Sequence, residues 1–504
     1  MASIQEKLAD SLGVLKAFQD SSKSVVIRGS KTLGETHTRR LVQNGYLEQI
    51  IKGWYMPTMP GMEGDSTAWY ASYWNFIVDY ANSRFGDEWS LTPEESLDFY
   101  AGETSTPRQL IIRSTNASNN VVALKHGDSL LDISASLPRR VVVEPRYGLR
   151  IYSLAEALTF CSPAYFVKSA VNARTCLLMV KSADEILKEV ADEGNSSRAS
   201  RLVGALKNVG KNEMAETIKD FMTRLGHHLR LEDPFADKPL ASLVDNGTTS
   251  PYAIRIRLMW QKMREQILAL GLTQSPVKKS AEETLSDMDE NYVRDSYHSL
   301  SIEGYRVTEG LIERVRSGKW SPNDDKEDSD RRNALAARGY YQAFLQVKES
   351  VKKILQGAMA GEVVGGDFEK WHFEMFQPCI TAGIIKPSAL VGYRSNQVFI
   401  RGSKHTPLSA DAVRDVMPVF IELMATEPDV RVRAILGHFF FVFIHPYMDG
   451  NGRTARFIMN VMLVTGGYHW KIVNVENRSN YMAALEKASI DGDIRDFARI
   501  VLQD

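Results

Sequence analysis

The length, composition and charge of the chain indicate an ordinary globular protein. Its 504 residues suffice for about three domains, and a hydrophobic fraction of 44% with 24% charged residues supplies several cores. The formal net charge of −1 argues against a protein that coats nucleic acid along its whole length. The three cysteines lack the spacing of a metal site, so we expect a reducing compartment and no disulfide framework.

The N-terminal segment 1–18 contains early acidic residues and lacks the apolar stretch of a signal peptide. No window reaches the roughly 18 uncharged apolar residues that a membrane-spanning helix needs. We therefore expect a cytoplasmic protein with no membrane partner.

Residues 1–60 predict a small helical unit closed by a hairpin. Apolar residues recur at helical spacing over Ile4–Phe18, and a second helix is expected over Glu35–Asn44, ending at Gly45. Segment 46–57 predicts two short strands around a Lys-Gly turn. Helices followed by a basic-tipped hairpin are typical of a winged helix.

The charge of residues 1–60 makes DNA a candidate partner of this region. It holds eight basic residues against five acidic ones, whereas the whole chain is balanced. Arg39 and Arg40 on the second helix and Lys52 at the hairpin turn would contact phosphates. A basic-faced protein-interaction domain is the alternative.

Residues 61–230 predict a mixed α+β domain, and 231–251 predict a linker rich in turn signals. Residues 252–504 predict a strongly helical domain. The expected fold class is therefore multidomain: a winged helix, a mixed domain and an all-α core that carries one β-hairpin. Strands are expected over 109–113 and 140–144, and helices over 155–160, 164–187 and 198–225.

The segment from His445 to Arg456 is the most informative part of the chain, and its residues are typical of a polyphosphate site. His445 can accept a proton near neutral pH, and Asp449 is a hard oxygen ligand suited to Mg²⁺. The amides of Gly450, Asn451 and Gly452, at the start of a helix, form an anion-binding nest. Arg453 and Arg456 share one face of that helix and suit the outer phosphates of a nucleoside triphosphate.

This segment resembles the Fic family signature, from which it departs only at Tyr447, where the family has Phe. The resemblance implies a protein adenylyltransferase that moves AMP from ATP to a Ser, Thr or Tyr hydroxyl of a protein partner. His445 would be the general base, and Asp449 would hold Mg²⁺. The site residues for the phosphates would be Gly450, Asn451, Gly452, Arg453 and Arg456.

Two further segments resemble the family less specifically. A flap over 392–403 would pair with the target peptide, and its hairpin is predicted from alternation around Val398 and Ile400. Tyr481 would line the adenine pocket, with helix packing as the alternative. The docking residues implied for the flap are Gly392, Tyr393, Arg394, Val398 and Ile400.

Segment 299–304, Ser-Leu-Ser-Ile-Glu-Gly, resembles the inhibitory helix that some Fic proteins carry ahead of the core. The helix is expected over about 286–304, with Ser299 and Glu303 as its inhibitory residues. By the resemblance Glu303 would pair with Arg456, exclude the γ-phosphate, and in some settings assist removal of AMP.

Two alternative functions stay open at this point. Residues 1–230 resemble abortive-infection antitoxin regulators, so the chain could be a DNA-binding regulator whose Fic domain is a sensor or silent. Kinase-like transfer of the γ-phosphate is a further option, against which Gly452 argues. The sequence leaves the protein target, the DNA site and a homodimer undecided.

Overall fold

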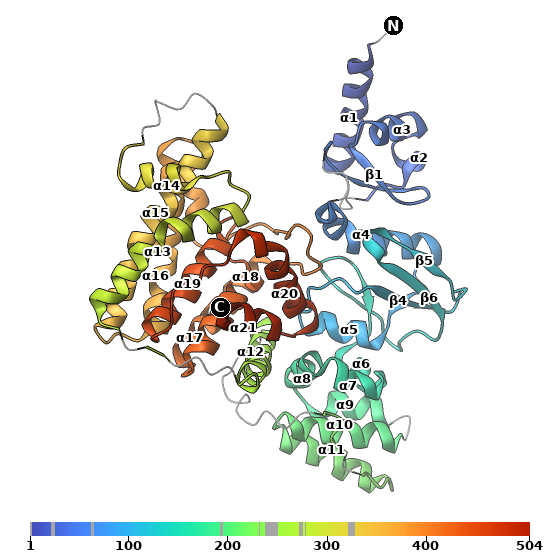
Figure 1. The fold of residues 1–504 in the computed structure, drawn as a ribbon. Coiled ribbons are helices and arrows are strands. Elements are labelled where there is room, and N and C mark those ends of the chain that lie inside the picture. Colours follow the sequence, from blue (N-terminus) through green and yellow to red (C-terminus); the bar gives the residue numbers. More distant parts are fainter. Residues whose placement is uncertain are drawn as a thin grey trace. The chain divides into compact units, whose positions relative to one another are not determined.

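The structure, a computed structural model, describes residues 3–21, 26–61, 65–191, 195–230, 232–236, 250–271, 276–277, 279–320 and 328–503. The chain divides into two compact units (Figure 1). The first is Met1–Pro251 with Phe399–Thr406, and the second is Tyr252–Val398 with Pro407–Asp504. Most of the predicted linker 231–251 lies outside the described residues.

The first unit begins with three helices and a hairpin around a small core. The elements are α1 (Ile4–Ser21), α2 (Gly29–Thr32), α3 (Glu35–Gln43), β1 (Leu47–Ile51) and β2 (Trp54–Pro57). The strands are antiparallel, with Ile51 opposite Trp54 across the Lys52-Gly53 turn. Leu15, Leu33 and Leu41 are buried in one cluster beneath them. The assignment as a winged helix, and its binding to DNA, stay predictions.

A four-stranded sheet follows, in the order β3-β4-β6-β5, with β4 and β6 parallel and the outer pairs antiparallel. On α4, Trp69, Tyr73, Phe76 and Ile77 are fully buried at helical spacing, so one face of this helix enters the core. The elements of this part are α4 (Ser66–Phe85), β3 (Ser90–Leu91), α5 (Pro93–Tyr100), β4 (Gln109–Ser114), β5 (Val121–Ala123), β6 (Ser129–Ser134), β7 (Val142–Val143) and β8 (Arg150–Ile151).

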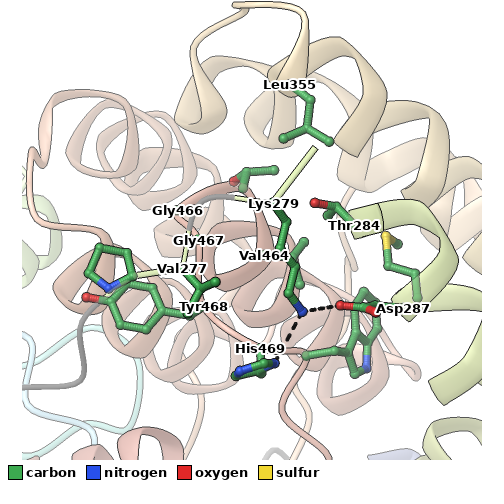
Figure 2. Close-up of a pocket in the computed structure, with 14 residues that line it drawn as sticks. Val277, Lys279, Thr284, Asp287, Leu355, Val464, Gly466, Gly467, Tyr468 and His469 are labelled. Carbon is green, nitrogen blue, oxygen red and sulfur yellow. Dashed lines mark hydrogen bonds and ion pairs between the residues drawn. The ribbon is translucent and has the colours of Figure 1, made fainter. Parts of the chain in front are cut away.

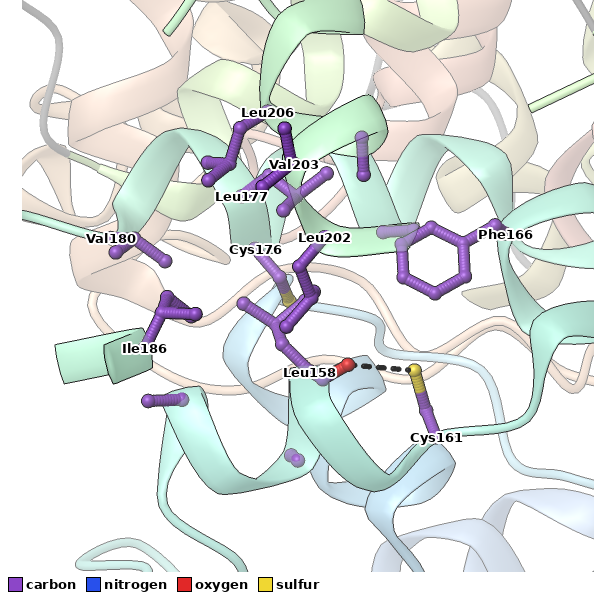
Figure 3. Close-up of a cluster of buried hydrophobic side chains, with 14 of the residues drawn as sticks. Leu158, Cys161, Phe166, Cys176, Leu177, Val180, Ile186, Leu202, Val203 and Leu206 are labelled. Atoms are coloured by element: carbon purple, nitrogen blue, oxygen red, sulfur yellow. Dashed lines mark hydrogen bonds between the residues drawn. The ribbon is translucent and has the colours of Figure 1, made fainter. Parts of the chain in front are cut away.

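The rest of the first unit is helical and has its own core, part of which is drawn in Figure 3. The sequence predicts one mixed domain over 61–230, and within this range the structure has two hydrophobic cores, one in the sheet part and one in the helical part. The single helices expected over 164–187 and 198–225 are broken, the second at Gly210 with a φ of +79°. The helices are α6 (Leu154–Phe160), α7 (Pro163–Lys168), α8 (Ala170–Met179), α9 (Ala183–Ala191), α10 (Ser196–Asn208) and α11 (Asn212–Arg224).

Segment Phe399–Thr406 belongs to the first unit, although it follows the second unit's residues in the chain. His405 forms an isolated antiparallel bridge with Ser105. Lys404 Nζ lies 2.6 Å from the buried carboxylate of Asp128, and Phe399 packs against the core of the sheet part.

The second unit contains helices and no strand among its described residues, which agrees with the predicted helical core but not with the hairpin predicted within it. Its elements are α12 (Pro251–Ala269), α13 (Ala281–Ile302), α14 (Glu309–Arg316), α15 (Asp328–Leu355), α16 (Ala360–Thr381), α17 (Ala410–Thr426), α18 (Val430–Ile444), α19 (Asn451–Thr465), α20 (Arg478–Asp491) and α21 (Arg495–Leu502).

Helices α18 and α19 lie in the middle of the second unit (Figure 1). Most of their residues are buried. Asp429 caps α18 by accepting hydrogen bonds from the amides of Arg431 and Val432. Gly437 lets α19 approach closely, since a β-carbon there would lie 3.1 Å from Ile458 Cγ2. The loop between these helices therefore rests on a rigid base.

The hairpin expected over 392–403 is not confirmed. In the described chain this segment contains no strand, and a turn links the Ser403 amide to the Ile400 carbonyl at 3.1 Å. None of the described helices is long and apolar enough to span a membrane.

Candidate active site

The loop from His445 to Gly450 joins α18 to α19 through two left-handed residues. His445 has φ 56° and ψ 61°, and Gly450 has φ 85° at the N-cap of α19. A left-handed backbone costs a residue other than glycine about 1–2 kcal/mol. That cost persists at His445 only because the surrounding contacts fix the loop.

A hydrogen bond and burial fix the tautomer and the protonation state of His445. Its Nδ1 lies 3.1 Å from the carbonyl oxygen of Val442, and since a carbonyl only accepts, Nδ1 carries the proton and Nε2 keeps its lone pair. Burial, with a smaller contribution from Arg394, lowers the pKa of His445 to about 4. The imidazole is therefore neutral at pH 7, with the lone pair of Nε2 unprotonated.

The backbone of the loop is fixed by two polar side chains. The side chain of Asn451 binds both backbone polar groups of Tyr447. Its Oδ1 accepts from Tyr447 N at 3.0 Å, and its Nδ2 donates to Tyr447 O at 2.9 Å. Arg394 donates from Nε to the carbonyl of His445 at 2.7 Å and from its backbone amide to Pro446 O at 2.9 Å. Arg394 is 3% exposed, so it clamps the loop here, whereas the sequence predicts it as a docking residue.

Asp449 lies at the open side of the loop, and its side chain is 61% exposed. Its Oδ1 accepts from Gly450 N at 2.5 Å and from Arg453 Nη2 at 3.1 Å. Burial alone would lower the pKa of Arg453, but Asp449, Tyr305 and Glu303 together outweigh burial, so the pKa is raised. The Arg453 guanidinium lies over the rings of Tyr305 and Phe376.

The sequence prediction missed His372 of α16, which packs under the same loop. Its ring stacks on Tyr447 with centroids 3.7 Å apart, and its Nε2 lies 3.0 Å from the Asp449 carbonyl. Burial lowers its pKa to about 4. A lone histidine within a predicted helix carries no signal of such a role. The Tyr447 hydroxyl is buried and has no hydrogen-bond partner among the described residues.

Glu303, the C-cap of α13, lies against Arg456. Glu303 Oε1 accepts from Arg456 Nη2 at 2.7 Å, and Ser299 accepts from the same guanidinium through Oγ at 2.8 Å and through its carbonyl at 3.0 Å. Burial opposes ionisation of Arg456, but the Glu303 carboxylate together with Tyr481 and Tyr340 outweighs burial, so the pKa of Arg456 is raised. Helix α13 starts at Ala281, earlier than the predicted residue 286.

Gly452 shows where the Glu303 carboxylate sits. A β-carbon at this position would collide with Glu303 Oε1. The carboxylate thus lies directly over the first turn of α19, where backbone amides and the positive end of the helix dipole attract anions. Glu303 occupies the place in which the sequence predicts a phosphate.

The remaining predicted residues lie outside the contacts between Glu303 and Arg456, although the Tyr393 ring lies near that of Tyr447, with centroids 6.0 Å apart. Tyr481 of α20 is 1% exposed and its hydroxyl lies 2.8 Å from His438 Nε2, so it packs in the core beside Arg456. Gly392, Tyr393, Val398 and Ile400 lie in an irregular segment of the chain, and Ile400 falls within the first unit's Phe399–Thr406.

The DNA-contact candidates belong to the first unit. Arg39 and Lys52 are exposed, whereas Arg40 donates from Nη1 to Lys7 O and to Ser11 Oγ, both at 2.7 Å. Arg40 therefore fastens α3 to α1, and its guanidinium is less available to a phosphate than the sequence suggests.

The described residues contain no group of three or more His, Cys, Asp or Glu side chains that could hold a metal ion. A single carboxylate fits Mg²⁺ that arrives with a nucleotide, because Mg²⁺ is usually bound by one or two carboxylates plus substrate phosphates. Asp449 is the exposed carboxylate of the loop and would be that ligand.

A cavity of about 380 Å³ lies beside the start of α13 and the end of α19 (Figure 2). Glu303 and Arg456 lie toward the other ends of these helices. Lys279 Nζ is paired there with Asp287 and donates to His469 Nδ1 at 3.5 Å. No predicted site residue lines this cavity, so it is separate from the cluster around Arg456.

Part of the chain is similar to known proteins. Residues 367–463 match the model of the Fic/DOC family. The protein adenylyltransferase Fic of Nematostella vectensis is 27% identical over 242 residues, 47% of this chain and 51% of that protein. The protein adenylyltransferase fic-1 of Caenorhabditis elegans is 28% identical over 220 residues, 42% of this chain and 40% of that protein.

A solved part of Fic-1 from C. elegans aligns with 69% of this chain and 93% of its own length, at a TM-score of 0.36 and 19% identity. The chain spans about half or less of the length of the curated relatives that it matches. The range 367–463 that matches the Fic/DOC family model lies in the second unit and includes the loop from His445 to Arg456.

Proposed function

We propose that the protein transfers AMP from ATP to a Ser, Thr or Tyr hydroxyl of a protein, itself included, and that Glu303 holds it in an inactive state. The carrying observation is the Glu303 carboxylate, 2.7 Å from Arg456 and over Gly452. A carboxylate in that position mimics an outer phosphate of ATP. The curated relatives named protein adenylyltransferase support the reaction class.

In the reaction, the target hydroxyl oxygen attacks the α-phosphorus of ATP. The new bond joins that oxygen to phosphorus, the bond from the α-phosphorus to the oxygen bridging to the β-phosphate breaks, and pyrophosphate leaves. His445 Nε2 accepts the hydroxyl proton, for which its neutral state prepares it. Mg²⁺ held by Asp449 would neutralise charge on the α- and β-phosphates.

The amides at the start of α19 and the Arg453 and Arg456 guanidiniums would bind the phosphates. These donors are pre-oriented by buried contacts, so they need little reorganisation when charge develops. In the inactive state the Arg456 guanidinium is bound by Glu303 and Ser299. ATP has to displace the Glu303 carboxylate before its γ-phosphate can bind. The same glutamate could orient water for the reverse task, removal of AMP.

The test compares ATP labelled at the α-phosphate with ATP labelled at the γ-phosphate. The full chain with Glu303→Gly should transfer only the α-label, to itself or to proteins of a lysate, and at least about 10-fold faster than the parent. Adding His445→Ala should reduce transfer by about 10²–10⁴-fold.

Equal labelling by the parent and Glu303→Gly would contradict the inactive state, and transfer of the γ-label would contradict the reaction. Undiminished labelling by the double variant Glu303→Gly, His445→Ala would contradict the role of the base.

A further inference from the structure

The carbonyl group of the peptide between Asp449 and Gly450 points toward α16. Its carbonyl oxygen lies 3.0 Å from His372 Nε2. Since a carbonyl oxygen only accepts, His372 is the donor, and its proton is on Nε2. In a trans peptide the carbonyl and the amide of the same plane point in opposite directions. A donor that fixes the Asp449 carbonyl therefore also fixes the direction of the Gly450 N–H.

The Gly450 N–H is the first amide of the predicted nest. It donates to Asp449 Oδ1 at 2.5 Å on the side away from His372. When Asp449 Oδ1 turns to a metal ion, this amide becomes free for a phosphate oxygen. Glycine at φ 85° can adopt other conformations at little cost, so without a restraint the peptide can rotate and present its carbonyl to the phosphate.

His372 is itself well restrained. It is 4% exposed, and its ring lies parallel to that of Tyr447, at an interplanar angle of 12°. A β-carbon at Gly450 would lie 3.3 Å from His372 Cδ2 and 2.8 Å from Phe376 Cε2. The loop and α16 are thus in close contact, and the histidine has little room to turn away.

We propose that His372 is a positioning residue, which holds the Asp449–Gly450 peptide so that its N–H faces the phosphates of ATP. This inference rests on the proposed function for the identity of the ligand. It gives a residue outside the His445–Arg456 segment a defined task, orientation of one anion-binding amide. It also gives the Tyr447 ring a task, as the surface on which His372 is stacked.

The experiment measures binding, so that it is independent of transfer. In the full chain carrying Glu303→Gly, the affinity for a non-hydrolysable ATP analogue with Mg²⁺ and for adenosine is measured by calorimetry. His372→Phe keeps an aromatic ring against Tyr447 and loses the donor. It should weaken the analogue about 10-fold or more and leave adenosine binding unchanged. His372→Gln, whose amide nitrogen reaches the position of Nε2, should restore most of the affinity.

Transfer rates provide the second readout. His372→Phe should lower kcat by up to about 100-fold, as expected for a misplaced reactive group. Trp371→Phe is the matched control, because Trp371 is a buried neighbour on α16 whose Nε1 donates to Ser350 Oγ at 3.1 Å, away from the loop. It should lower the melting temperature without changing either affinity.

Equal loss of analogue and adenosine binding in His372→Phe, or no loss of either, would overturn the inference. If His372→Phe does not fold, the pair His372→Gln and His372→Asn decides, since the shorter amide cannot reach the carbonyl; equal affinities in this pair would overturn the inference. Failure of Glu303→Gly to transfer the α-label would contradict the proposed function instead.

Discussion

The arginines of two regions of the chain are used in opposite ways. Arg453 and Arg456 in the second unit are 1% and 3% exposed, and each lies against a carboxylate. Arg39 in the first unit is exposed. A buried guanidinium needs a defined partner to offset its desolvation, whereas an exposed guanidinium can bind any anion that approaches from solvent. Burial therefore makes the second unit's arginines informative about function in a way that Arg39 is not.

The largest expected effect separates these two kinds of arginine directly. In the Glu303→Gly chain, Arg456→Ala should reduce transfer of the α-label about 10²–10³-fold, because it removes a pre-oriented donor to the phosphates of ATP. Arg39→Ala in the same background is the control and should leave the rate unchanged. Initial rates at saturating target measure both, and similar rates in the two variants would break the comparison.

The buried histidine beneath the loop predicts a dependence of stability on pH. Burial lowers the pKa of His372 to about 4 in the folded chain, whereas an unfolded histidine has a pKa of about 6.5. Between these pKa values the unfolded state binds more protons than the folded state. The contribution of His372 to the free energy of unfolding is therefore complete above pH 6.5 and is lost as the pH falls toward 4.

By pH 5 the parent should lose about 2 kcal/mol of its free energy of unfolding through this group. Urea denaturation at pH 7.5 and pH 5 measures the loss, and His372→Phe should show less of it. An equal loss in the parent and the variant would contradict the assigned pKa.

Removal of the inhibitory carboxylate should cost stability while it raises activity. Glu303→Ala leaves Arg456 buried with only Ser299 as a hydrogen-bond acceptor on α13. Because the Glu303 side chain is 28% exposed, the cost should be about 1–3 kcal/mol, below that of a fully buried pair. Thermal unfolding measures it, and addition of ATP with Mg²⁺ should restore more stability to the variant than to the parent.

The smallest effects concern the arginines of α3. Arg40→Ala should cost about 1 kcal/mol, since it removes the bonds to Lys7 O and Ser11 Oγ. Arg39→Ala should cost less than about 0.5 kcal/mol.

If the first unit binds DNA, removal of one side chain that neutralises a phosphate should lower the slope of log K against log salt concentration by about 0.9. Absence of any band shift at low salt would end the DNA prediction.

The part of the site that the sequence predicts best is the part whose residues are adjacent in the chain. The His445–Arg456 segment contains its base, nest and arginines within one loop and one helix turn, so spacing alone brings them together. The pairing of Glu303 with Arg456 spans 153 positions, and only the resemblance of segment 299–304 to an inhibitory helix predicts it.

Other features depend on packing that spacing does not reveal. His372 reaches the loop from α16, 77 positions away, and nothing in its own segment distinguishes it from a structural histidine. Alternation around Val398 and Ile400 predicts a hairpin, but no strand forms in 392–403. The basic face of α3 predicts that Arg40 binds DNA, whereas its guanidinium is used within the unit.

Segment Phe399–Thr406 has a consequence for how the protein can be divided. A shortened chain that begins at residue 252 would keep these residues but lose the unit to which they belong. Phe399 would lose its packing against the sheet part, and Lys404 its partner Asp128. The fragment would thus expose an apolar ring and lack an ion pair that the intact chain contains. Boundaries chosen from the sequence order alone would therefore yield a piece with different solution behaviour from that of the intact protein.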